Sequence, residues 1–480
     1  MSDMGGISDD ETFSGLPVEG GPGRKESLYL PYDSVYEELA AERVRGFSWN
    51  WDESSPCSSW SSDSCGPSSL SLMVGESARP TTFAMPDIVP LFVHRSPCVS
   101  SMSIYPSDLV QGEYDYQGIP WSRFSISRSE YRQKRIKEYS NYNNVNWNAK
   151  LEYQRRLEIS GRVVCGNFFS FYETYKSINP TIDHFQLRHL LYSTSNVLSY
   201  YVSNSILYSF NKQKKVSKKI IEKSQMASAC VDHGLAAAGS FNSDVSVAFL
   251  ARRDGAAHMV IRMSELENSI TNHVLITSPS EILVANNDMH LSKIDVSAGR
   301  VAFKYKWTSA VNHVSQGPSG LCCLSGDDCV ATLWDARAGP TGSLAGHLDY
   351  LFCSSWQSST VVCTGSQDGT CRVWDLRQPR TAVTVLGSVL GAVRSATFSP
   401  NGGKFLAFSE PADIVHIYDT STFKECQVVD FFGNIGGIAF SPDASKLSVA
   451  VADTMFGSIV DFQIGTLPIN TTKRPNTSSH

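Results

Sequence analysis

The sequence predicts an all-β chain that folds as a seven-bladed β-propeller, and three observations predict it. The first is Val361–Arg377, which has the pattern of two strands joined by a tight turn and ends in a Trp-Asp pair before its last two residues. The second is a Gly-His pair upstream, Gly346-His347. The third is that this skeleton recurs at a period of about 40–45 residues, the length of one propeller blade.

The repeats follow one another at regular steps. Trp334-Asp335 and Trp374-Asp375 end two units that are 40 residues apart, and Tyr418-Asp419 ends the next unit 44 residues later. The remaining unit ends are Ile294-Asp295, Val460-Asp461 and, more weakly, Leu250 and Tyr208. Seven units therefore fit between about residues 185 and 464.

Each unit shows the alternation and the turns that strands need. In the sixth, residues 392–398 alternate, 399–402 form a Ser-Pro-Asn-Gly turn, and 404–408 and 413–419 supply two further strands. In the seventh, little sequence after Phe462 remains for a fourth strand. We therefore expect a segment within Val163–Tyr175 to close the ring.

The composition indicates a protein without membrane spans or metal. The net charge is −6 over 480 residues, which does not favour a dedicated nucleic-acid binder. The apolar runs are too short to span a membrane, and the acidic start lacks the pattern of a signal peptide. We expect a cytoplasmic or nuclear location.

The cysteines predict neither disulfides nor a metal site. No Cys-x-x-Cys pair and no His/Cys set with zinc spacing occurs among the twelve cysteines. Four of them fall in predicted strands, where Cys acts as a small buried hydrophobe: Cys322, Cys323, Cys363 and Cys371. No cofactor is expected.

The chain outside the propeller divides into three parts. Residues 1–110 are expected to be a disordered tail rich in Ser and Gly, and 471–480 a disordered C-terminus, around a propeller at 161–470. An aromatic cluster in the tail, Phe47–Asp52, is either a docking motif or an incidental apolar island. Whether the tail serines are phosphorylated stays open.

Residues 111–160 are expected to be a docking segment that contains a turn and a short basic helix. Ser127 and Glu130 have the spacing of a helix capping box, and Tyr131–Tyr139 follows as the helix. The helix either docks on the propeller with its charges in water or contacts an acidic partner or an import receptor. A second basic run, Lys212–Lys219, is expected on an exposed blade connection.

The best repeat resembles the WD repeat, and that resemblance implies roles for four residues. His347, Thr364, Asp368 and Trp374 should form a buried hydrogen-bonded set that fixes the blade. These roles are structural, and no residue is assigned to catalysis. The fourth unit keeps Asp328 and Trp334 but has Leu324 in place of the threonine.

The chain from about residue 111 to 462 also resembles an uncharacterised WD-repeat family of plants and fungi, described as transducin/WD-repeat-like. This resemblance implies the fold but no established activity. The motifs that carry it are Gln117–Trp121, the Tyr131-Arg-x-x-Arg helix, His184–Arg188, Gly346–Asp349, Arg394-Ser395, Glu410–Asp413 and Asp430–Gly433.

Three classes of function are open. The first is a non-catalytic scaffold for protein partners, with a peptide site on the top face around His347 and Gly391. The second is a substrate receptor of a cullin-RING ubiquitin ligase. The residues for docking its adaptor come from two Trp-Asp-x-Arg motifs: Trp334, Asp335, Arg337, Asp375 and Arg377.

An enzyme is the third class, and the sequence gives it little support. No nucleophile elbow or zinc-protease motif occurs. The glycine-rich stretch Gly339–Gly346 lacks the Gly-Lys-Ser/Thr ending of a phosphate loop and is expected to turn between strands.

Overall fold

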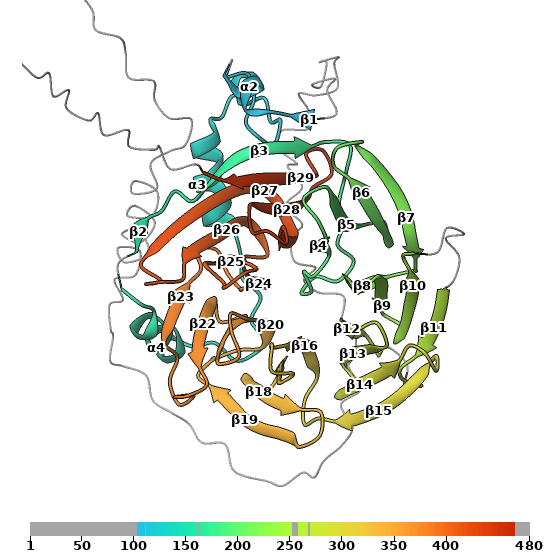
Figure 1. Cartoon of the computed structure of the whole chain (residues 1–480). Coiled ribbons are helices and arrows are strands. Elements are labelled where there is room, and N and C mark those ends of the chain that lie inside the picture. Colours follow the sequence, from blue (N-terminus) through green and yellow to red (C-terminus); the bar gives the residue numbers. More distant parts are fainter. Residues whose placement is uncertain (1–102, 111, 162, 252–257, 267–268, 466–480) are drawn as a thin grey trace, which may run out of the picture. The chain divides into compact units, whose positions relative to one another are not determined.

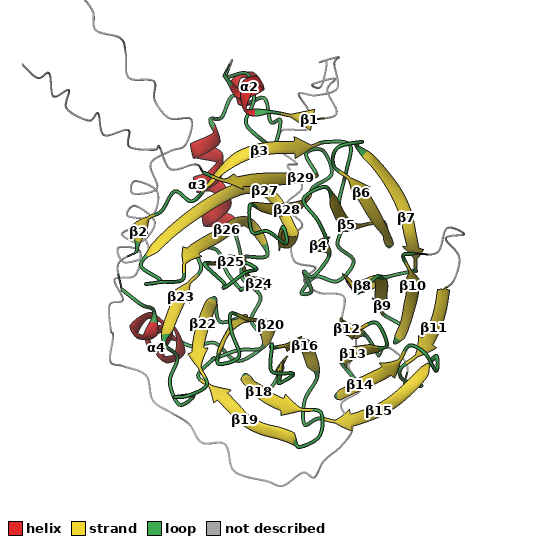
Figure 2. Cartoon of the chain, viewed as in Figure 1, coloured by secondary structure: helices red, strands yellow, loops and turns green. Residues whose placement is uncertain are grey.

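The computed structural model describes residues 103–110, 112–161, 163–251, 258–266 and 269–465. Within these ranges, seven four-stranded antiparallel blades follow one another around a ring (Figure 1), and strands dominate the chain (Figure 2). The seven-bladed propeller that the repeats predict is therefore confirmed. The aromatic cluster at 47–52, residues 1–102 of the serine-rich tail and residues 471–480 lie outside the described residues. The end of the tail that was expected to be disordered, residues 103–110, instead contains a short strand at 103–104 and a short helix at 106–109.

Five blades are separate four-stranded sheets. In each of them the strands follow one another in chain order from the innermost to the outermost. Blades 1 and 2 consist of β4 (Leu191–Ser193), β5 (Leu198–Ser203), β6 (Ile206–Asn211) and β7 (Val216–Glu222), then β8 (Met226–Asp232), β9 (Leu235–Ser240), β10 (Asp244–Phe249) and β11 (His258–Arg262). Blade 3 consists of β12 (Thr271–Ser278), β13 (Glu281–Asn286), β14 (His290–Asp295) and β15 (Arg300–Lys306). Blades 4 and 5 consist of β16 (Val311–Gln316), β17 (Cys322–Gly326), β18 (Val330–Asp335) and β19 (Gly339–Ala345), then β20 (Leu351–Trp356), β21 (Val361–Ser366), β22 (Thr370–Asp375) and β23 (Thr384–Gly387).

Blades 6 and 7 share one long strand, β27 (Glu425–Phe440). Its first half is the outermost strand of blade 6, after β24 (Ser395–Phe398), β25 (Phe405–Ser409) and β26 (Ala412–Asp419). Its second half is the innermost strand of blade 7, before β28 (Lys446–Ala452) and β29 (Ser458–Ile464).

The N-terminal strand β3 (Phe169–Tyr175) completes blade 7. It pairs antiparallel with β29 from Ile459↔Tyr175 to Ile464↔Phe169, so the ring is closed by a strand from within the predicted stretch. Two short strands add to the same sheet: β1 (Ser103–Ile104) pairs with β3, and β2 (Val164–Cys165) pairs in parallel with β27. Closure of this kind leaves few unpaired strand edges.

The core lies between neighbouring blades, where apolar side chains of adjacent sheets interdigitate. One cluster joins Cys363 and Val373 of blade 5 to Leu406, Phe408 and Tyr418 of blade 6. The four cysteines expected in strands are free thiols that are buried there as small apolar groups.

One strand stands where the sequence predicted a turn. The glycine-rich stretch that was expected to turn between strands is β19, the outermost strand of blade 4. An outer strand has one unpaired edge, so it tolerates the proline and glycines that a central strand would exclude.

Among the described residues, four helical segments precede the blades: α2 (Pro106–Leu109), the 3₁₀ turn η2 (Trp121–Arg123), α3 (Arg128–Glu138) and α4 (Ala149–Glu158). Ser127 caps α3 and forms the expected capping box with Glu130. The sequence analysis missed α4, which Asn148 caps by accepting a hydrogen bond from the Leu151 N–H. Among the described residues, no helix is both long and apolar enough to cross a membrane.

Candidate protein-interaction site

The loops of the ring define two faces. The top face carries the connections from one blade to the next and the turns between second and third strands. The bottom face carries the other two turns of each blade. Most residues singled out by the sequence lie on one of these faces.

The four residues implied by the WD-repeat resemblance meet in blade 5. The His347 ring contacts the Asp368 carboxylate through Nδ1 at 3.0 Å and the Thr364 hydroxyl through Nε2 at 2.8 Å, and the Trp374 indole N–H donates to the same hydroxyl at 2.8 Å. Burial acts to raise the pKa of Asp368, but His347 and hydrogen bonds from Thr370 and Leu348 outweigh it and lower that pKa to about 2. This set ties the top loop of blade 5 to its inner strands.

Blade 4 lacks such a set. Leu324 stands where blade 5 has Thr364, and among the described residues the buried Trp334 indole N–H has no acceptor. Asp328 instead accepts a hydrogen bond at 3.3 Å from the indole of Trp307. Trp334 is only 2% exposed, so its side chain offers no surface to a partner.

The basic helix α3 is clamped to the top of blades 6 and 7 by its arginines. Arg128 donates to both carboxylate oxygens of Asp430, at 2.8 and 3.0 Å, and Arg132 donates to Asp413 at 2.7 Å. Arg135 also donates twice to Asp413, at 2.5 and 2.7 Å. Paired guanidinium–carboxylate contacts of this geometry are among the strongest polar contacts in proteins.

Charge pairing decides the ionisation of this clamp. Burial acts to raise the pKa of Asp430, but Arg128 and Arg132 lower it to about 2. The guanidinium of Arg132 also lies over the Phe432 ring, 4.2 Å from its centroid. The helix therefore lies on the propeller, with the charges of Arg132 and Arg135 buried in ion pairs and not in water.

The chain between α3 and α4 lies against the top loops of blade 5. The Asn144 backbone N–H and side-chain amide both donate to Asp349, each at 3.2 Å. The Gln367 amide donates to Asn141 at 3.0 Å, and a side chain at Gly391 would collide with Asn141 at 2.6 Å. This contradicts the expected peptide site around His347 and Gly391, because the protein's own chain covers those loops.

Helix α4 and the residue after it pack on the outer strands of blade 5. Glu158 accepts from Arg372 of β22 at 2.5 Å, and the Ser160 hydroxyl contacts the Thr384 hydroxyl of β23 at 2.7 Å. Ile159 lies so close to Gly387 that an added Cβ would meet it at 3.0 Å. Residues 128–160 thus run from blade 7 to blade 5 as a strap.

The two Trp-Asp-x-Arg motifs end in matching turns on the bottom face. The backbone N–H of Arg337 donates to Asp335 at 2.8 Å, and that of Arg377 donates to Asp375 at 3.0 Å. Both arginines are exposed. The Arg377 guanidinium folds back on Asp375, with Nε–Oδ1 at 2.9 Å, and its hydrogen bonds lower the pKa of that carboxyl to about 2.

The second basic run is not simply an exposed connection. Lys212 is buried and donates to both carboxylate oxygens of Asp461 in blade 7, at 2.9 and 2.8 Å, and to the Ser448 hydroxyl at 2.8 Å. Lys218 and Lys219 lie in the outer strand β7 and are exposed. Lys212 therefore fastens blade 1 to blade 7.

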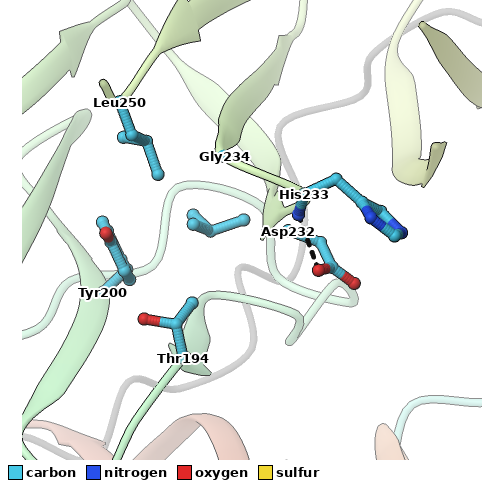
Figure 3. A pocket seen from close by; sticks show the side chains of 7 residues that line it. Thr194, Tyr200, Asp232, His233, Gly234 and Leu250 are labelled. Carbon is cyan, nitrogen blue, oxygen red and sulfur yellow. Dashed lines mark hydrogen bonds between the residues drawn. The ribbon is translucent and has the colours of Figure 1, made fainter. Parts of the chain in front are cut away.

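A shallow pocket opens on the bottom face between blades 1 and 2 (Figure 3). It holds about 250 Å³ and is lined by Thr194, Tyr200, Val231, Asp232, His233, Gly234 and Leu250. Figure 3 shows the His233 ring pointing away from Tyr200 and Leu250. A site of this size is smaller than ordinary ligand pockets, which begin at about 300 Å³.

Three histidines that no sequence pattern indicated lie together at the innermost strands of the ring. His189, His273 and His313 place one nitrogen each within 4.8 Å of the others. No spacing rule for metal ligands finds them, because they are far apart in the sequence. His189 lies in the loop before β4, His273 in β12 and His313 in β16. The one available signal is that His273 and His313 are 40 residues apart, the repeat period.

Comparison with known proteins agrees with the architecture. The model of an uncharacterised protein domain (DUF2415) matches residues 391–430, a stretch that contains both aspartates of the α3 clamp. A guanine nucleotide-binding protein subunit beta of Arabidopsis thaliana is 30% identical over 32% of this chain and 46% of its own length. A THO complex subunit 6 of Arabidopsis thaliana is 37% identical over 16% of this chain and 22% of its own length. The chain thus matches less than half the length of these relatives.

Two solved structures share the fold. The WD40 beta propeller domain of Doa1 has a TM-score of 0.52 at 13% identity, covering 62% of this chain and 97% of that one. A chain of a Mitotic Checkpoint Complex has a TM-score of 0.51 at 16% identity, covering 68% of this chain and 97% of that one. The chain has the WD-repeat β-propeller fold. Its resemblance to one plant and fungal family stays a prediction.

Proposed function

We propose that this protein is a non-catalytic scaffold of the cytoplasm or nucleus that binds protein partners through the bottom face of blades 4 and 5. The observation that carries the proposal is the pair of matching turns on neighbouring blades, each of which presents an exposed arginine. A rigid ring with variable turns suits binding without chemistry.

The occupied top face supports this choice of surface. Over blades 5 to 7 the strap covers the loops that would otherwise receive a peptide, and it is held by buried ion pairs. Breaking such pairs is costly because it leaves charges buried without a partner. A partner must therefore displace the strap before it can reach the top loops of blades 5 to 7.

The names of the relatives agree with a role in assemblies. Two of them are named as subunits, one of a guanine nucleotide-binding protein and one of a THO complex. No partner of either protein is transferred to this chain.

The test is cross-linking mass spectrometry and affinity purification from cells. Arg337→Ala with Arg377→Ala should lose the reproducible partners of the wild type. The control, Arg123→Ala with Lys137→Ala, removes the same charge at exposed positions of the N-terminal segment and should keep them. Equal recovery of partners by all three proteins would overturn the choice of surface.

A substrate receptor of a cullin-RING ubiquitin ligase is the second candidate, favoured by the same two turns. In that case Arg337 and Arg377 pair with carboxylates or carbonyls of the ligase adaptor, after Arg377 releases Asp375. Wild-type protein should then capture the adaptor and the double variant should not. Wild-type protein that never captures the adaptor removes this candidate but leaves the scaffold intact.

A further inference from the structure

Two arginines at the top of the ring are buried without a counter-ion. Arg188 lies in the loop before β4 and Arg394 directly before β24, so each leads into the innermost strand of a blade (Figure 1). They are only 5% and 3% exposed. Among the described residues neither has a carboxylate oxygen within 4.0 Å, whereas the buried Arg132 and Arg135 of the strap both do.

The hydrogen bonds of these two arginines leave several N–H groups over. Arg188 Nη1 donates to the backbone carbonyls of His184 and Leu187, at 2.9 and 3.1 Å, but its buried Nε has no partner among the described residues. Arg394 Nη2 donates to the Gln367 side chain at 2.5 Å, and its Nε and Nη1 likewise have none. Since buried polar groups are nearly always paired, these N–H groups point to an acceptor that the chain does not itself supply.

An aromatic ring fixes the Arg394 guanidinium but cannot accept from its unpaired N–H groups. The Arg394 Cζ atom lies over the Phe352 ring, 4.2 Å from its centroid. A guanidinium that stacks in this way keeps its N–H groups directed outward in its own plane. The arginine is therefore held in place while two of its donor nitrogens remain available to an oxygen.

Tyr139 supplies a hydroxyl beside both cations. It caps the C-terminus of α3, and its ring lies against Gly391, where an added Cβ would meet Cε1 at 3.2 Å. Its hydroxyl makes no hydrogen bond to any residue that the structure describes. Burial raises the pKa of Tyr139 to about 12 against the opposing charges of Arg394 and Arg188, so the hydroxyl stays a donor at neutral pH.

The charges of this group favour an anion. Burial and the neighbouring charge of Arg188 lower the pKa of Arg394 to about 9, and burial lowers the pKa of Arg188 to about 10. Both groups are still charged at pH 7. Burial and the same two arginines lower the pKa of His184 to about 3, so its ring is neutral there. Two buried positive charges without a counter-ion are unfavourable, and an anion between them would remove the penalty.

The nearby carboxylates are engaged elsewhere. The charge of Asp349 acts on Arg394 and that of Glu410 acts on Tyr139, but neither forms an ion pair with these two arginines. Asp349 accepts from the backbone N–H of Tyr350, and Glu410 accepts from three backbone N–H groups at 389–391. The donors of the two arginines are therefore left for a group from outside the chain.

We propose that Arg188, Arg394 and Tyr139 bind a phosphate group at the top of the ring, either as inorganic phosphate or as a small phosphate monoester. Guanidinium N–H groups match phosphate oxygens in pairs, and a phosphate dianion balances two positive charges. The strap covers the adjoining loops of blade 5, so the group that binds is small and not a polypeptide. The site is separate from the bottom-face turns, and its test does not depend on the proposed function.

The experiment is a titration of the full chain in chloride buffer, after dialysis that removes phosphate and sulfate. Inorganic phosphate should bind to one site per chain by calorimetry and should raise the melting temperature to a plateau, while chloride at equal ionic strength should not. Glycerol 3-phosphate distinguishes the two sources. Equal binding of this monoester identifies a phosphate ester as the ligand, and binding of inorganic phosphate alone identifies the free ion.

Variants test the assigned residues. Arg394→Met should abolish phosphate binding, and the control Arg123→Met, which changes an exposed arginine of the N-terminal segment, should bind as the wild type does. Tyr139→Phe covers the case in which Arg394→Met fails to fold. It removes one hydroxyl, keeps both arginines and should weaken phosphate binding about tenfold or more.

Three results would overturn the proposal. The first is wild-type protein that responds to phosphate no more than to chloride. The second is a folded Arg394→Met variant that binds phosphate as tightly as the wild type. The third is undiminished phosphate affinity of Tyr139→Phe.

Discussion

Trp334 and Trp374 end equivalent strands of neighbouring blades, but only Trp374 has an acceptor for its indole N–H among the residues described. The difference comes from one substitution in the repeat, since Leu324 replaces the threonine that Trp374 uses. The two tryptophans are therefore a matched pair for measuring what the hydrogen-bonded set contributes.

Trp374→Phe should lower the free energy of unfolding more than Trp334→Phe, by about 1–3 kcal/mol. Both changes remove similar apolar volume from a buried place, so the difference isolates the bond to Thr364. Chemical denaturation of the two variants measures it. Equal losses would show that the set contributes no net stability.

Asp413→Asn should release the strap from the top face. Asp413 accepts from Arg132, from Arg135 and from the Gly433 N–H, and the amide cannot balance two buried guanidinium charges. Its backbone is in the left-handed region at φ 67°, which Asn tolerates, so the variant tests charge alone.

Asp413→Asn should lower the free energy of unfolding by about 3–5 kcal/mol. Backbone amide hydrogen exchange should become faster only in α3 and the chain that follows it. Asp232→Asn, an exposed change on the bottom face, is the control. Unchanged exchange in α3 would contradict the clamp.

Lys212→Met should destabilise the closure between blades 1 and 7. It leaves the Asp461 carboxylate buried with the hydroxyls of Ser448 and Tyr175 as side-chain partners but without its cation, which should lower the free energy of unfolding by about 3–5 kcal/mol. Lys214→Met, an exposed change in the same basic run, should have little effect on the thermal midpoint. Adding Asp461→Asn to Lys212→Met should recover part of the loss, because no unpaired charge is then buried.

Asp327→Asn should stabilise the protein at neutral pH but not in acid. Burial raises the pKa of Asp327 to about 6, above its unfolded value of about 3.9. The folded chain therefore holds a proton that the unfolded chain has lost between these values, and the contribution of Asp327 to stability falls as pH rises from 4 to 6.

The uncharged variant lacks this penalty and can still accept the hydrogen bond from Asn312. Its free energy of unfolding should exceed that of the wild type by about 1–3 kcal/mol at pH 7 and should equal it below pH 4. Chemical denaturation at several pH values across that range measures the difference. Asp335→Asn should instead lower the free energy of unfolding at neutral pH, because hydrogen bonds from Ala338 and Arg337 favour the charged carboxylate and lower the pKa of Asp335. A gain for Asp327→Asn that does not vary with pH would contradict the assignment.

Repetition explains why the fold could be predicted from sequence. Each blade repeats the same strands and turns, so the unit ends from Ile294 to Val460 locate the blades without any knowledge of contacts between them. The missing fourth strand of blade 7 then required the N-terminal strand β3.

Contacts between distant segments could not be predicted in the same way. Arg132 and Asp413 are 281 residues apart, and neither residue type indicates that its partner is buried beside it. The short polar helix α4 has no strong apolar stripe of its own, and blade 5 supplies the surface on which it packs. The histidine cluster depends on how closely two innermost strands and the loop before β4 approach one another, which no local pattern encodes.

Because β3 and its partner β29 lie far apart in the sequence, β3 is synthesised long before β29. This strand leaves the ribosome complete at residue 175, while its partner β29 begins at residue 458. At about 5–20 residues per second, the nascent chain carries β3 for roughly 15–60 s before the strand that pairs with it exists. Throughout that interval the growing protein is an open ring with an unpaired edge, the form most prone to join another chain.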